Sequence, residues 1–260
     1  MPVETKQSIN IDKSNHPVKG VGYLPYGERR LPRRAKGNRN EAFLIKSDLN
    51  HNQWLDDTIL PGFRQGVELY AATIEALALK LVKVFAVALE LDPSYFDAAF
   101  EQPFWRLRMT HYPPVIGNQR VVVVDEEEEN GAGGSVRAHG IAPHVDTSFF
   151  TLLLQDSPGL VIYSARRQKW IQVPFVKHAF VVNVGELLKQ WSNDRFISAR
   201  HFADNNNSSK SRYSIPFFLN ANADYPMKCL PTCCSSADGS NPPKYPTISY
   251  NQSQAIAQGE

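Results

Sequence analysis

A histidine and an aspartate two residues apart, His144 and Asp146, stand just before the apolar run at residues 149–154. Side chains alternate between the two faces of a β-strand, so a strand through this segment would point both side chains the same way. Two ligands on one wall leave a metal ion in need of a third ligand from elsewhere in the chain. The fold must therefore bring a distant strand alongside this one.

The candidate for the third ligand is His201, which follows a second apolar run at residues 180–184 and a helix-like segment. Two imidazoles and one carboxylate on one face of an octahedron are typical of non-haem Fe(II) oxygenases, where the opposite face stays open. Further along, Arg212 and Ser214 open a third apolar run, residues 215–219. On a strand these two side chains share a face, and a guanidinium beside a hydroxyl suits a carboxylate ligand.

Each of these short patterns has a simpler explanation when it stands alone. A His-x-Asp pair is most often a surface loop or a satisfied polar pair, and Arg-x-Ser is less specific still. Their order and spacing favour a metal site, because the candidate ligands stand at the ends of separate predicted strands, where an open site can be held rigidly. His111 is a rival ligand, although its neighbours favour a histidine in a pocket wall or at a strand end. His139 has no carboxylate at the right spacing.

Further blocks between residues 101 and 220 add to these patterns. They are Glu101-Gln102-Pro103, Arg108-Met109-Thr110-His111-Tyr112-Pro113-Pro114, Thr151-Leu152-Leu153-Leu154-Gln155-Asp156, Gly159-Leu160, Phe180-Val181-Val182-Asn183-Val184-Gly185-Glu186 and Arg212-Tyr213-Ser214-Ile215-Pro216-Phe217-Phe218. With His144-Val145-Asp146 between the second and third blocks, the chain resembles the isopenicillin N synthase-like family of 2-oxoglutarate- and Fe(II)-dependent dioxygenases. Chance agreement over so many ordered blocks is implausible.

The resemblance implies a mainly β fold with flanking helices, built on a double-stranded β-helix (jelly-roll, cupin-like) core. It implies that His144, Asp146 and His201 hold Fe(II) and form the catalytic centre near the mouth of the barrel. The family pattern usually has Asp where Glu186 stands and Arg where Phe202 stands, so substrate contacts do not transfer in detail. We expect Glu186 to support the site or cap a helix rather than bind the metal.

The same resemblance implies 2-oxoglutarate as co-substrate and O2 as oxidant. Arg212 and Ser214 are expected to bind the distal carboxylate of 2-oxoglutarate, with assistance from Tyr112. The expected reaction hydroxylates, desaturates or cyclises a small-molecule metabolite and releases succinate and CO2. Candidate pocket neighbours for that metabolite are Phe149, Phe150, Arg106, Arg108, His111 and Phe218.

Two other functions stay open at this point. One is an Fe(II) oxidase of the same fold that works without 2-oxoglutarate, as isopenicillin N synthase does, with the matching Arg and Ser on a substrate carboxylate. The other is an N-terminally truncated, inactive relative, because family members usually carry a section before the segment that matches residues 8–25. That section includes strands that complete the barrel, and an incomplete barrel would expose sheet edges.

At 260 residues, the chain suits one large domain or two small ones. We expect an N-terminal loop and helical scaffold at residues 1–100, the dioxygenase core at residues 101–225 and a C-terminal tail packed on the core at residues 226–260. A long scaffold helix is predicted to follow Phe63 and to end before Asp92-Pro93. Its predicted buried face, from spacings of three and four, comprises Val67, Tyr70, Ile74, Leu77, Leu81, Val84 or Phe85, and Ala88.

The net charge of +2 gives no general case for a nucleic-acid or anionic-membrane partner. The most apolar long stretch, residues 71–91, carries four charged residues, which argues against a membrane span. The N-terminus has no apolar run typical of a signal peptide. We therefore expect a cytoplasmic enzyme that acts on a small molecule, with a monomer favoured although the sequence does not fix the oligomeric state.

Two charged segments and a cysteine cluster each allow more than one interpretation. The basic run at residues 28–39 is either a solvated loop or a lid that steers an anionic substrate. The acidic run at residues 125–129 favours a solvated loop over a cation site, because adjacent carboxylates point apart and repel. Cys229, Cys233 and Cys234 are expected to be reduced and partly buried rather than zinc ligands, since no fourth ligand lies close.

Overall fold

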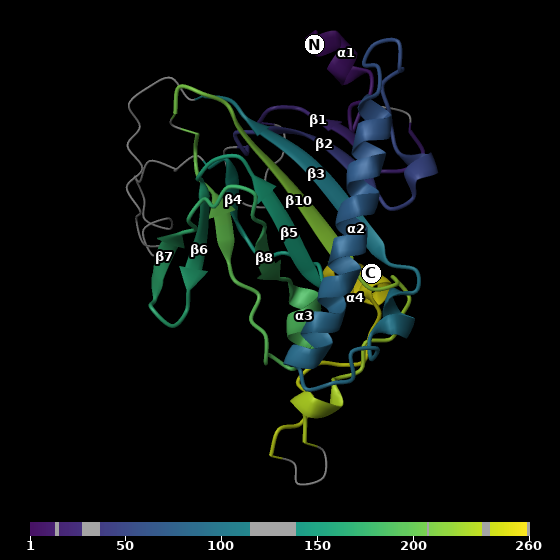
Figure 1. The fold of residues 1–260 in the computed structure, drawn as a ribbon, viewed down its shortest axis with the longest axis vertical. Helices are drawn as coiled ribbons and strands as arrows, with labels where there is room; N and C mark the ends of the chain where they lie inside the picture. The colour runs from purple at the N-terminus through teal and green to yellow at the C-terminus, as the bar shows by residue number, and fades with distance from the viewer. Residues whose placement is uncertain (14–15, 28–36, 115–138, 207, 236–239, 259–260) are drawn as a thin grey trace.

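Two β-sheets face each other, and helices lie outside them (Figure 1). This architecture is seen in a computed structural model that describes residues 1–13, 16–27, 37–114, 139–206, 208–235 and 240–258. The basic segment at residues 28–36 and the acidic run at residues 125–129 lie outside the described residues. The predicted mainly β fold with flanking helices, a double-stranded β-helix, is confirmed.

The larger sheet has six strands in the order β1-β2-β3-β10-β5-β8, and the smaller has four in the order β4-β9-β6-β7. Neighbouring strands within each sheet are antiparallel. In the larger sheet the bounds are β1 Gly22–Leu24, β2 Glu41–Lys46, β3 Phe104–Tyr112, β10 Arg212–Asn220, β5 Phe150–Gln155 and β8 Val181–Val184. In the smaller sheet they are β4 Ile141–His144, β9 His201–Ala203, β6 Leu160–Ser164 and β7 Lys169–Gln172.

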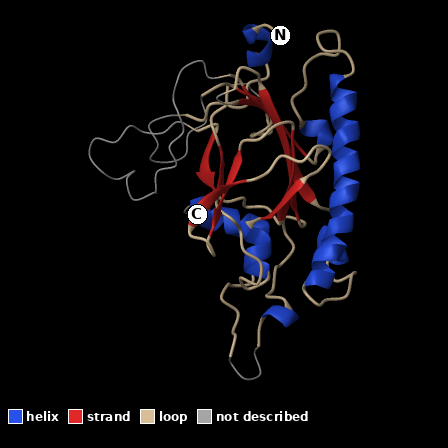
Figure 2. Ribbon diagram, turned by 60° about the vertical axis from the view of Figure 1, so that its left-hand side comes forward, coloured by secondary structure: helices blue, strands red, loops and turns tan. Residues whose placement is uncertain are grey.

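Among the described residues, four α-helices flank the sheets (Figure 1). They are α1 Val3–Gln7, α2 Phe63–Ala88, α3 Glu186–Trp191 and α4 Tyr250–Gln258, with 3-10 turns at Leu49–His51, Asp97–Phe100 and Pro231–Cys233. The long helix α2 runs along the outer side of the strands (Figure 2). Within the described part of the chain, no helix has both the length and the hydropathy needed to cross a membrane.

The face that α2 buries differs from the one that the spacing predicts. Leu77 and Ala88, assigned to the buried face, are exposed, so that part of the prediction is wrong. Of the alternatives Val84 and Phe85, it is Phe85 that packs against the core. The residues of α2 that are buried are Val67, Ala71, Ile74, Ala78, Val82 and Ala86. Alanines have no bulk beyond Cβ, so the helix backbone can approach the large side chains of Trp105 and Phe217 on the sheet closely.

Alternation along the strands separates an apolar face from a polar one. On β10, Phe217 and Leu219 are buried in the core that includes α2, whereas Arg212 and Ser214 line the space between the sheets. On β3, Trp105 belongs to the same core as α2. The period of two along a strand therefore places charged and hydroxyl side chains in the interior, opposite the smaller sheet.

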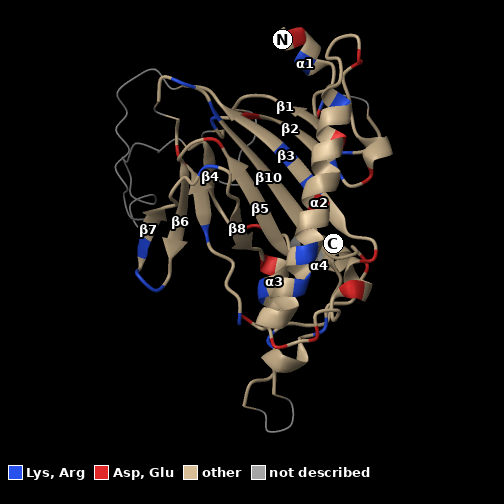
Figure 3. Ribbon diagram, viewed as in Figure 1, with Lys and Arg blue, Asp and Glu red and all other residues tan. Residues whose placement is uncertain are grey.

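The N-terminal portion contributes strands as well as a helix. Residues of β2 pair with β3 from Glu41↔His111 to Lys46↔Arg106, and β1 pairs with β2. Residues before position 100 therefore complete one side of the larger sheet, and the proposed division at residues 100 and 225 stays a prediction. Charged residues are spread over strands, helices and turns rather than gathered on one element (Figure 3).

Candidate active site

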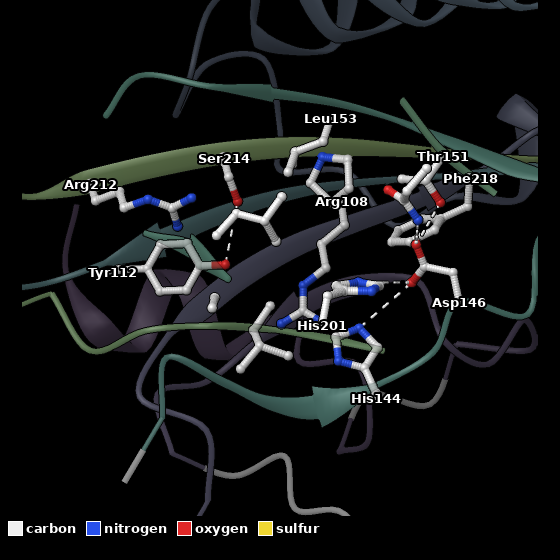
Figure 4. Close-up of a pocket in the computed structure, with 15 residues that line it drawn as sticks. Arg108, Tyr112, His144, Asp146, Thr151, Leu153, His201, Arg212, Ser214 and Phe218 are labelled. Atoms are coloured by element: carbon white, nitrogen blue, oxygen red, sulfur yellow. Dashed lines mark hydrogen bonds and ion pairs between the residues drawn. The ribbon is translucent and has the colours of Figure 1, made fainter. Parts of the chain in front are cut away.

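A pocket between the two sheets contains the candidate ligands (Figure 4). The larger sheet contributes side chains from β3, β5, β8 and β10, and the smaller sheet contributes side chains from β4, β6 and β9. His144, Asp146, His201, Arg212, Ser214 and Tyr112, all six predicted site residues, line it. The fold thus gathers into one cavity side chains that are spread over about a hundred residues of sequence.

The three candidate metal ligands come from the ends of two paired strands. His144 ends β4 and His201 opens β9, and the two are register partners with ring centroids 4.4 Å apart. Nε2 of each ring lies 3.6 Å from Oδ1 of Asp146. One nitrogen or oxygen atom from each residue falls within 4.8 Å of the others, a cluster that could hold a metal ion.

The sequence argument for this cluster is corrected in one respect. It places His144 and Asp146 on one face of a continuous strand, but β4 ends at His144 and Asp146 lies beyond it. The backbone after the strand, whose carbonyl at Asp146 accepts a hydrogen bond from the amide of Glu186, brings the carboxylate back to the histidines. Glu186 thus contacts Asp146 through its backbone, and its side chain pairs with Lys189.

Both histidine rings are oriented by backbone carbonyls. Nδ1 of His144 lies 2.8 Å from the carbonyl oxygen of Ala142, and Nδ1 of His201 lies 2.9 Å from that of Ala199. A carbonyl can only accept, so each Nδ1 carries the proton and donates it. The lone pairs of both Nε2 atoms then point into the cluster, as a metal ligand requires.

The carboxylate of Asp146 is held by one of its two oxygens. Oδ2 accepts hydrogen bonds from Thr151 Oγ1 at 2.7 Å and Asn183 Nδ2 at 2.8 Å. Oδ1 is the oxygen that faces the histidines. Sequence reasoning did not single out Thr151 or Asn183 for this role, although each is a polar residue within an apolar strand, which was the available signal.

Burial and neighbouring charges together set the pKa values of Asp146 and His201. Burial alone would raise the pKa of Asp146, but interactions with His144 and His201 outweigh it and hold that pKa well below its usual value. Burial lowers the pKa of His201, an effect that the charge of Asp146 opposes only in part. The cluster therefore combines an ionised carboxylate with a histidine that favours its neutral form.

At the other end of the pocket, Arg212 and Ser214 lie on one face of β10 and are both 3% exposed. The Arg212 guanidinium donates to Gln155 Oε1 at 3.0 Å and to the carbonyl of Ser157 at 3.3 Å, and it lies 4.6 Å from the centre of the Tyr112 ring. The Tyr112 hydroxyl is 3.3 Å from Ser214 Oγ. The buried Nη1 of Arg212 has no hydrogen-bond partner among the described residues, so one charged donor is open to an anionic oxygen.

Gly159 makes room for the Arg212 side chain. It has φ +149°, and a Cβ at this position would stand 2.7 Å from Arg212 Nε. No side chain can occupy that space without displacing the guanidinium. This glycine belongs to the Gly159-Leu160 block, whose role the sequence alone did not indicate.

The two other histidines weighed as ligands lie outside the metal cluster. His111, the rival candidate, contacts Glu41 Oε1 and Ser211 Oγ, each at 2.8 Å, and stacks on Tyr213. His139 is buried with its ring edge-on to Phe202. Both fit the simpler interpretation, a histidine in a structural contact.

The candidate pocket neighbours divide between the pocket and the core. Arg108 and Phe218 line the pocket. Phe149 and Phe150 are fully buried in the apolar core beside Phe85 of α2, so their assignment to the pocket is wrong. The sequence could not separate these cases, because neighbouring strand residues face opposite sides and only the sheet pairing says which side is the interior.

The three cysteines are free thiols, as expected. Cys233 is buried, and Cys229 and Cys234 are half-buried. They lie in the C-terminal segment beside α3, where the amide of Leu230 donates to the carbonyl of Trp191. None of the three is among the described residues that line the pocket between the sheets.

Comparison with known sequences matches the same part of the chain. A sequence model of the 2OG-Fe(II) oxygenase superfamily matches residues 106–221. The 2-oxoglutarate-Fe(II) type oxidoreductase hxnY of Emericella nidulans is 38% identical over 95% of this chain and 70% of its own length. Azadirone synthase LFS of Melia azedarach is 35% identical over 97% of this chain and 74% of its own length.

Solved structures share the fold. JOX2 in complex with 2OG, Fe and JA superposes with a TM-score of 0.75 at 25% identity, over 98% of this chain and 69% of that one. The dioxygenase for auxin oxidation (DAO) in rice gives a TM-score of 0.71 at 23% identity, over 100% of this chain and 77% of that one. The chain belongs to the 2OG-Fe(II) oxygenase superfamily and is an oxidoreductase that uses Fe(II), 2-oxoglutarate and O2.

Proposed function

We propose that His144, Asp146 and His201 hold the Fe(II) of this enzyme. The observation that carries the proposal is the cluster of two Nε2 atoms and one carboxylate oxygen within 4.8 Å of one another. Two imidazole nitrogens and one carboxylate oxygen are the donor set that non-haem Fe(II) oxygenases use. His144 and His201 stand at the ends of β4 and β9, and Asp146 stands in the irregular segment after β4, which leaves the pocket side of the cluster open.

The surrounding contacts support this assignment. Each histidine already donates its Nδ1 proton to a backbone carbonyl, and Asp146 already uses Oδ2 on Thr151 and Asn183. The atoms left over are therefore the three that a metal ion needs, and their partners fix the orientation of each ligand.

We further propose that Arg212, Ser214 and Tyr112 bind the distal carboxylate of 2-oxoglutarate. The open Nη1 of Arg212 supplies a charged donor, and the hydroxyls of Ser214 and Tyr112 lie beside it. Gln155 and Gly159 support this end of the pocket, since Gln155 accepts from the guanidinium and Gly159 leaves space for it. A buried, charge-assisted contact of this kind discriminates strongly against a neutral ligand.

Fe(II) and 2-oxoglutarate, when bound with O2, supply the oxidation of a C–H bond with release of succinate and CO2. The protein's own part is to bind the metal ion, the co-substrate and the substrate and to orient them toward one another. The histidines and Asp146 fix the reacting centre, the Arg212 end fixes the co-substrate, and the apolar side chains of Leu153 and Phe218 narrow the remaining space. Enclosure between two sheets keeps bulk water from the reacting atoms.

The test is an anaerobic titration of the purified protein with Fe(II) and 2-oxoglutarate, followed by the visible charge-transfer band of the chelate. We expect a saturable band in the wild type and no band in His144→Ala. His51→Ala, which removes an exposed histidine paired with Asp48, is the matched control and should keep the band. A His144→Ala variant with wild-type iron affinity would remove this residue from the metal site.

We infer that the enzyme acts on a small molecule, as a monomer, in the cytoplasm. The support for a small molecule is the enclosed pocket, and the support for a reducing compartment is the set of three free thiols. We expect no nucleic-acid or membrane partner for this enzyme. Light scattering of the purified protein at several concentrations tests the monomer, and cell fractionation tests the location.

A further inference from the structure

His111, which lies outside the metal cluster, is the centre of a hydrogen-bonded row on the larger sheet. The strands β2, β3 and β10 lie near one another in this sheet (Figure 1), and Glu41 of β2 is the register partner of His111 on β3. Ser211 stands one residue before β10. Nδ1 of His111 lies 2.8 Å from Glu41 Oε1, and Nε2 lies 2.8 Å from Ser211 Oγ. A carboxylate, an imidazole and a serine hydroxyl in this order are the arrangement by which many hydrolases activate a serine.

The carboxylate of Glu41 fixes the direction of both hydrogen bonds. Burial acts to raise the pKa of Glu41, but hydrogen bonds from Tyr23, His111 and Lys6 outweigh it and lower the pKa to about 2. The carboxylate is therefore ionised at neutral pH and can only accept. In the neutral imidazole, Nδ1 then carries the proton and Nε2 the lone pair, so the Ser211 hydroxyl donates to Nε2. This is the state in which an imidazole can take the proton of an attacking serine.

The row is accessible from outside the metal pocket. The side chains of His111 and Glu41 are 28% and 19% exposed, and Ser211 is half-buried. None of the three is among the described residues that line the pocket between the sheets. Arg212 and Ser214 point into that pocket, so alternation along the chain places Ser211 on the opposite side of the sheet. A ligand can reach Ser211 there without passing the metal cluster.

A groove beside the row offers a place for the apolar part of a substrate. The ring of Tyr213 stacks on His111 with centroids 4.9 Å apart, and it lines this groove together with Leu154, Phe175 and Ile215. The remaining lining residues are polar. Such a lining suits an aromatic or short aliphatic group. We propose that Ser211, His111 and Glu41 form a second active site, which hydrolyses aryl or short-chain carboxylic esters without using iron.

The proposed reaction is an acyl transfer to serine followed by hydrolysis. Ser211 Oγ attacks the ester carbonyl carbon while its proton passes to His111 Nε2. The bond from that carbon to the alcohol oxygen breaks, and the alcohol leaves with the proton from Nε2. Water then attacks the acyl carbon and gives a proton to Nε2, and the carboxylic acid leaves as that proton returns to Oγ. Glu41 is a positioning residue, which orients His111 and stabilises its charged form.

The test uses the full chain with p-nitrophenyl acetate and p-nitrophenyl butyrate, whose leaving group is good, and follows release of nitrophenolate. EDTA is present, so that a metal-bound hydroxide cannot account for hydrolysis. The variants are Ser211→Ala and His111→Gln. The matched control is Ser94→Ala, which removes an exposed serine hydroxyl that donates to Asp92, away from the row. In parallel, the wild type is treated with diisopropyl fluorophosphate, and the modified residue is identified by peptide mass spectrometry.

We expect the wild type and Ser94→Ala to release several equivalents of nitrophenolate per protein molecule and to carry the phosphoryl adduct on Ser211. Both Ser211→Ala and His111→Gln should lose at least about a hundredfold in turnover, the size of a general-base contribution. Circular dichroism checks that each variant is folded, and Ser211→Ala decides the outcome if His111→Gln does not fold. No turnover by the wild type, wild-type turnover in Ser211→Ala or an adduct on another residue overturns the proposal. Hydrolysis that appears only when EDTA is left out belongs to the metal cluster and also overturns it.

The role of Glu41 has a readout of its own. Nitrogen NMR of the His111 ring should show the proton on Nδ1 in the wild type and a shift of the proton toward Nε2 in Glu41→Gln, at a temperature where this variant is folded. Turnover of the variant should fall together with that change, because a protonated Nε2 cannot accept the proton of Ser211. A folded Glu41→Gln with wild-type turnover would remove Glu41 from the proposed site.

Discussion

His144 and His201 lie opposite each other in the β4–β9 pair, with ring centroids 4.4 Å apart, although they are 57 positions apart in the sequence. A slip of one residue in this pairing would turn one imidazole to the other face of the sheet. The metal cluster therefore depends on strand register as well as on the identity of its ligands.

Thr151→Val should weaken metal binding without touching a ligand. The change keeps the shape of the side chain but removes the hydroxyl that donates to Asp146 Oδ2. Loss of such a supporting contact costs roughly ten- to a hundredfold in metal affinity. Anaerobic Fe(II) titration measures it, with Thr73→Val as the control because Thr73 lies exposed on α2. Equal affinities in the two variants would mean that Asn183 alone is enough to orient the carboxylate.

Gly159→Ala should weaken 2-oxoglutarate binding, although Gly159 is not one of the residues proposed to contact the co-substrate. The added Cβ would stand 2.7 Å from Arg212 Nε, so the guanidinium must move. We expect the apparent affinity for 2-oxoglutarate to fall roughly tenfold or more, as for loss of a charged hydrogen bond. Gly66→Ala on α2, where a Cβ meets nothing within 4 Å, is the matched control. If both variants bind 2-oxoglutarate like the wild type, Arg212 has more freedom than the structure shows.

Glu41→Gln should destabilise the fold in a pH-dependent way. Burial acts to raise the Glu41 pKa, but hydrogen bonds from Tyr23, His111 and Lys6 outweigh it and lower the pKa to about 2, from 4.5. A pKa that is lower in the folded state means that the ionised group stabilises the fold above about pH 4.5 and that this contribution is lost as the pH falls toward 2. We expect a loss of about 2 kcal/mol at pH 7, after allowance for solvent screening.

Urea denaturation of the wild type and Glu41→Gln at pH 7, 5, 4 and 3 tests this. The difference in free energy of unfolding should be largest at pH 7 and shrink below about pH 4.5. Glu68→Gln, which breaks an exposed pair with Arg64, is the control and should change stability by less than about 1 kcal/mol. A constant Glu41→Gln difference across the range would show that the side chain acts through packing rather than through its charge.

Ala78→Leu should destabilise the fold more than Leu77→Ala does, whereas the spacing of apolar residues, which assigns Leu77 to the buried face, predicts the reverse. Ala78 is fully buried against the sheet, so a larger side chain must push α2 away and should cost about 1–3 kcal/mol. Leu77 is 37% exposed, so its truncation should cost less, about 1 kcal/mol or below. Thermal and urea unfolding compare the two. A larger loss of stability in Leu77→Ala than in Ala78→Leu would mean that α2 buries the face that the spacing predicts.

Much of the site could be predicted because its chemistry is local. His144, Asp146 and Arg212-Tyr213-Ser214 stand in short segments whose spacing survives folding. The position of His201 after a second apolar run made it the candidate third ligand, and the resemblance supplied Tyr112. Which strands lie side by side could not be predicted from spacing. The carbonyl that orients each imidazole and the approach of Asn183 to Asp146 depend on that pairing, and they appear only in three dimensions.

The buried face of α2 could not be predicted for a different reason. Leucine and valine outrank alanine on any hydrophobic scale, so periodicity assigns them to the interior. The large aromatic side chains of the sheet fill much of the space, and the alanines at positions 71, 78 and 86 leave room for the helix backbone. The partly buried contact between Glu41 and His111 could not be predicted either, because its two partners are 70 positions apart in the sequence.

The two halves of the proposed site belong to different sheets, since the histidines come from β4 and β9 and the carboxylate-binding residues from β3 and β10. A metal-bound 2-oxoglutarate therefore ties one sheet to the other, as a removable cross-link across the barrel. Consumption of the co-substrate in each turnover would remove that cross-link and leave the hydrogen bonds from Thr151 and Asn183 to Asp146 as the lasting contact between the metal cluster and the larger sheet.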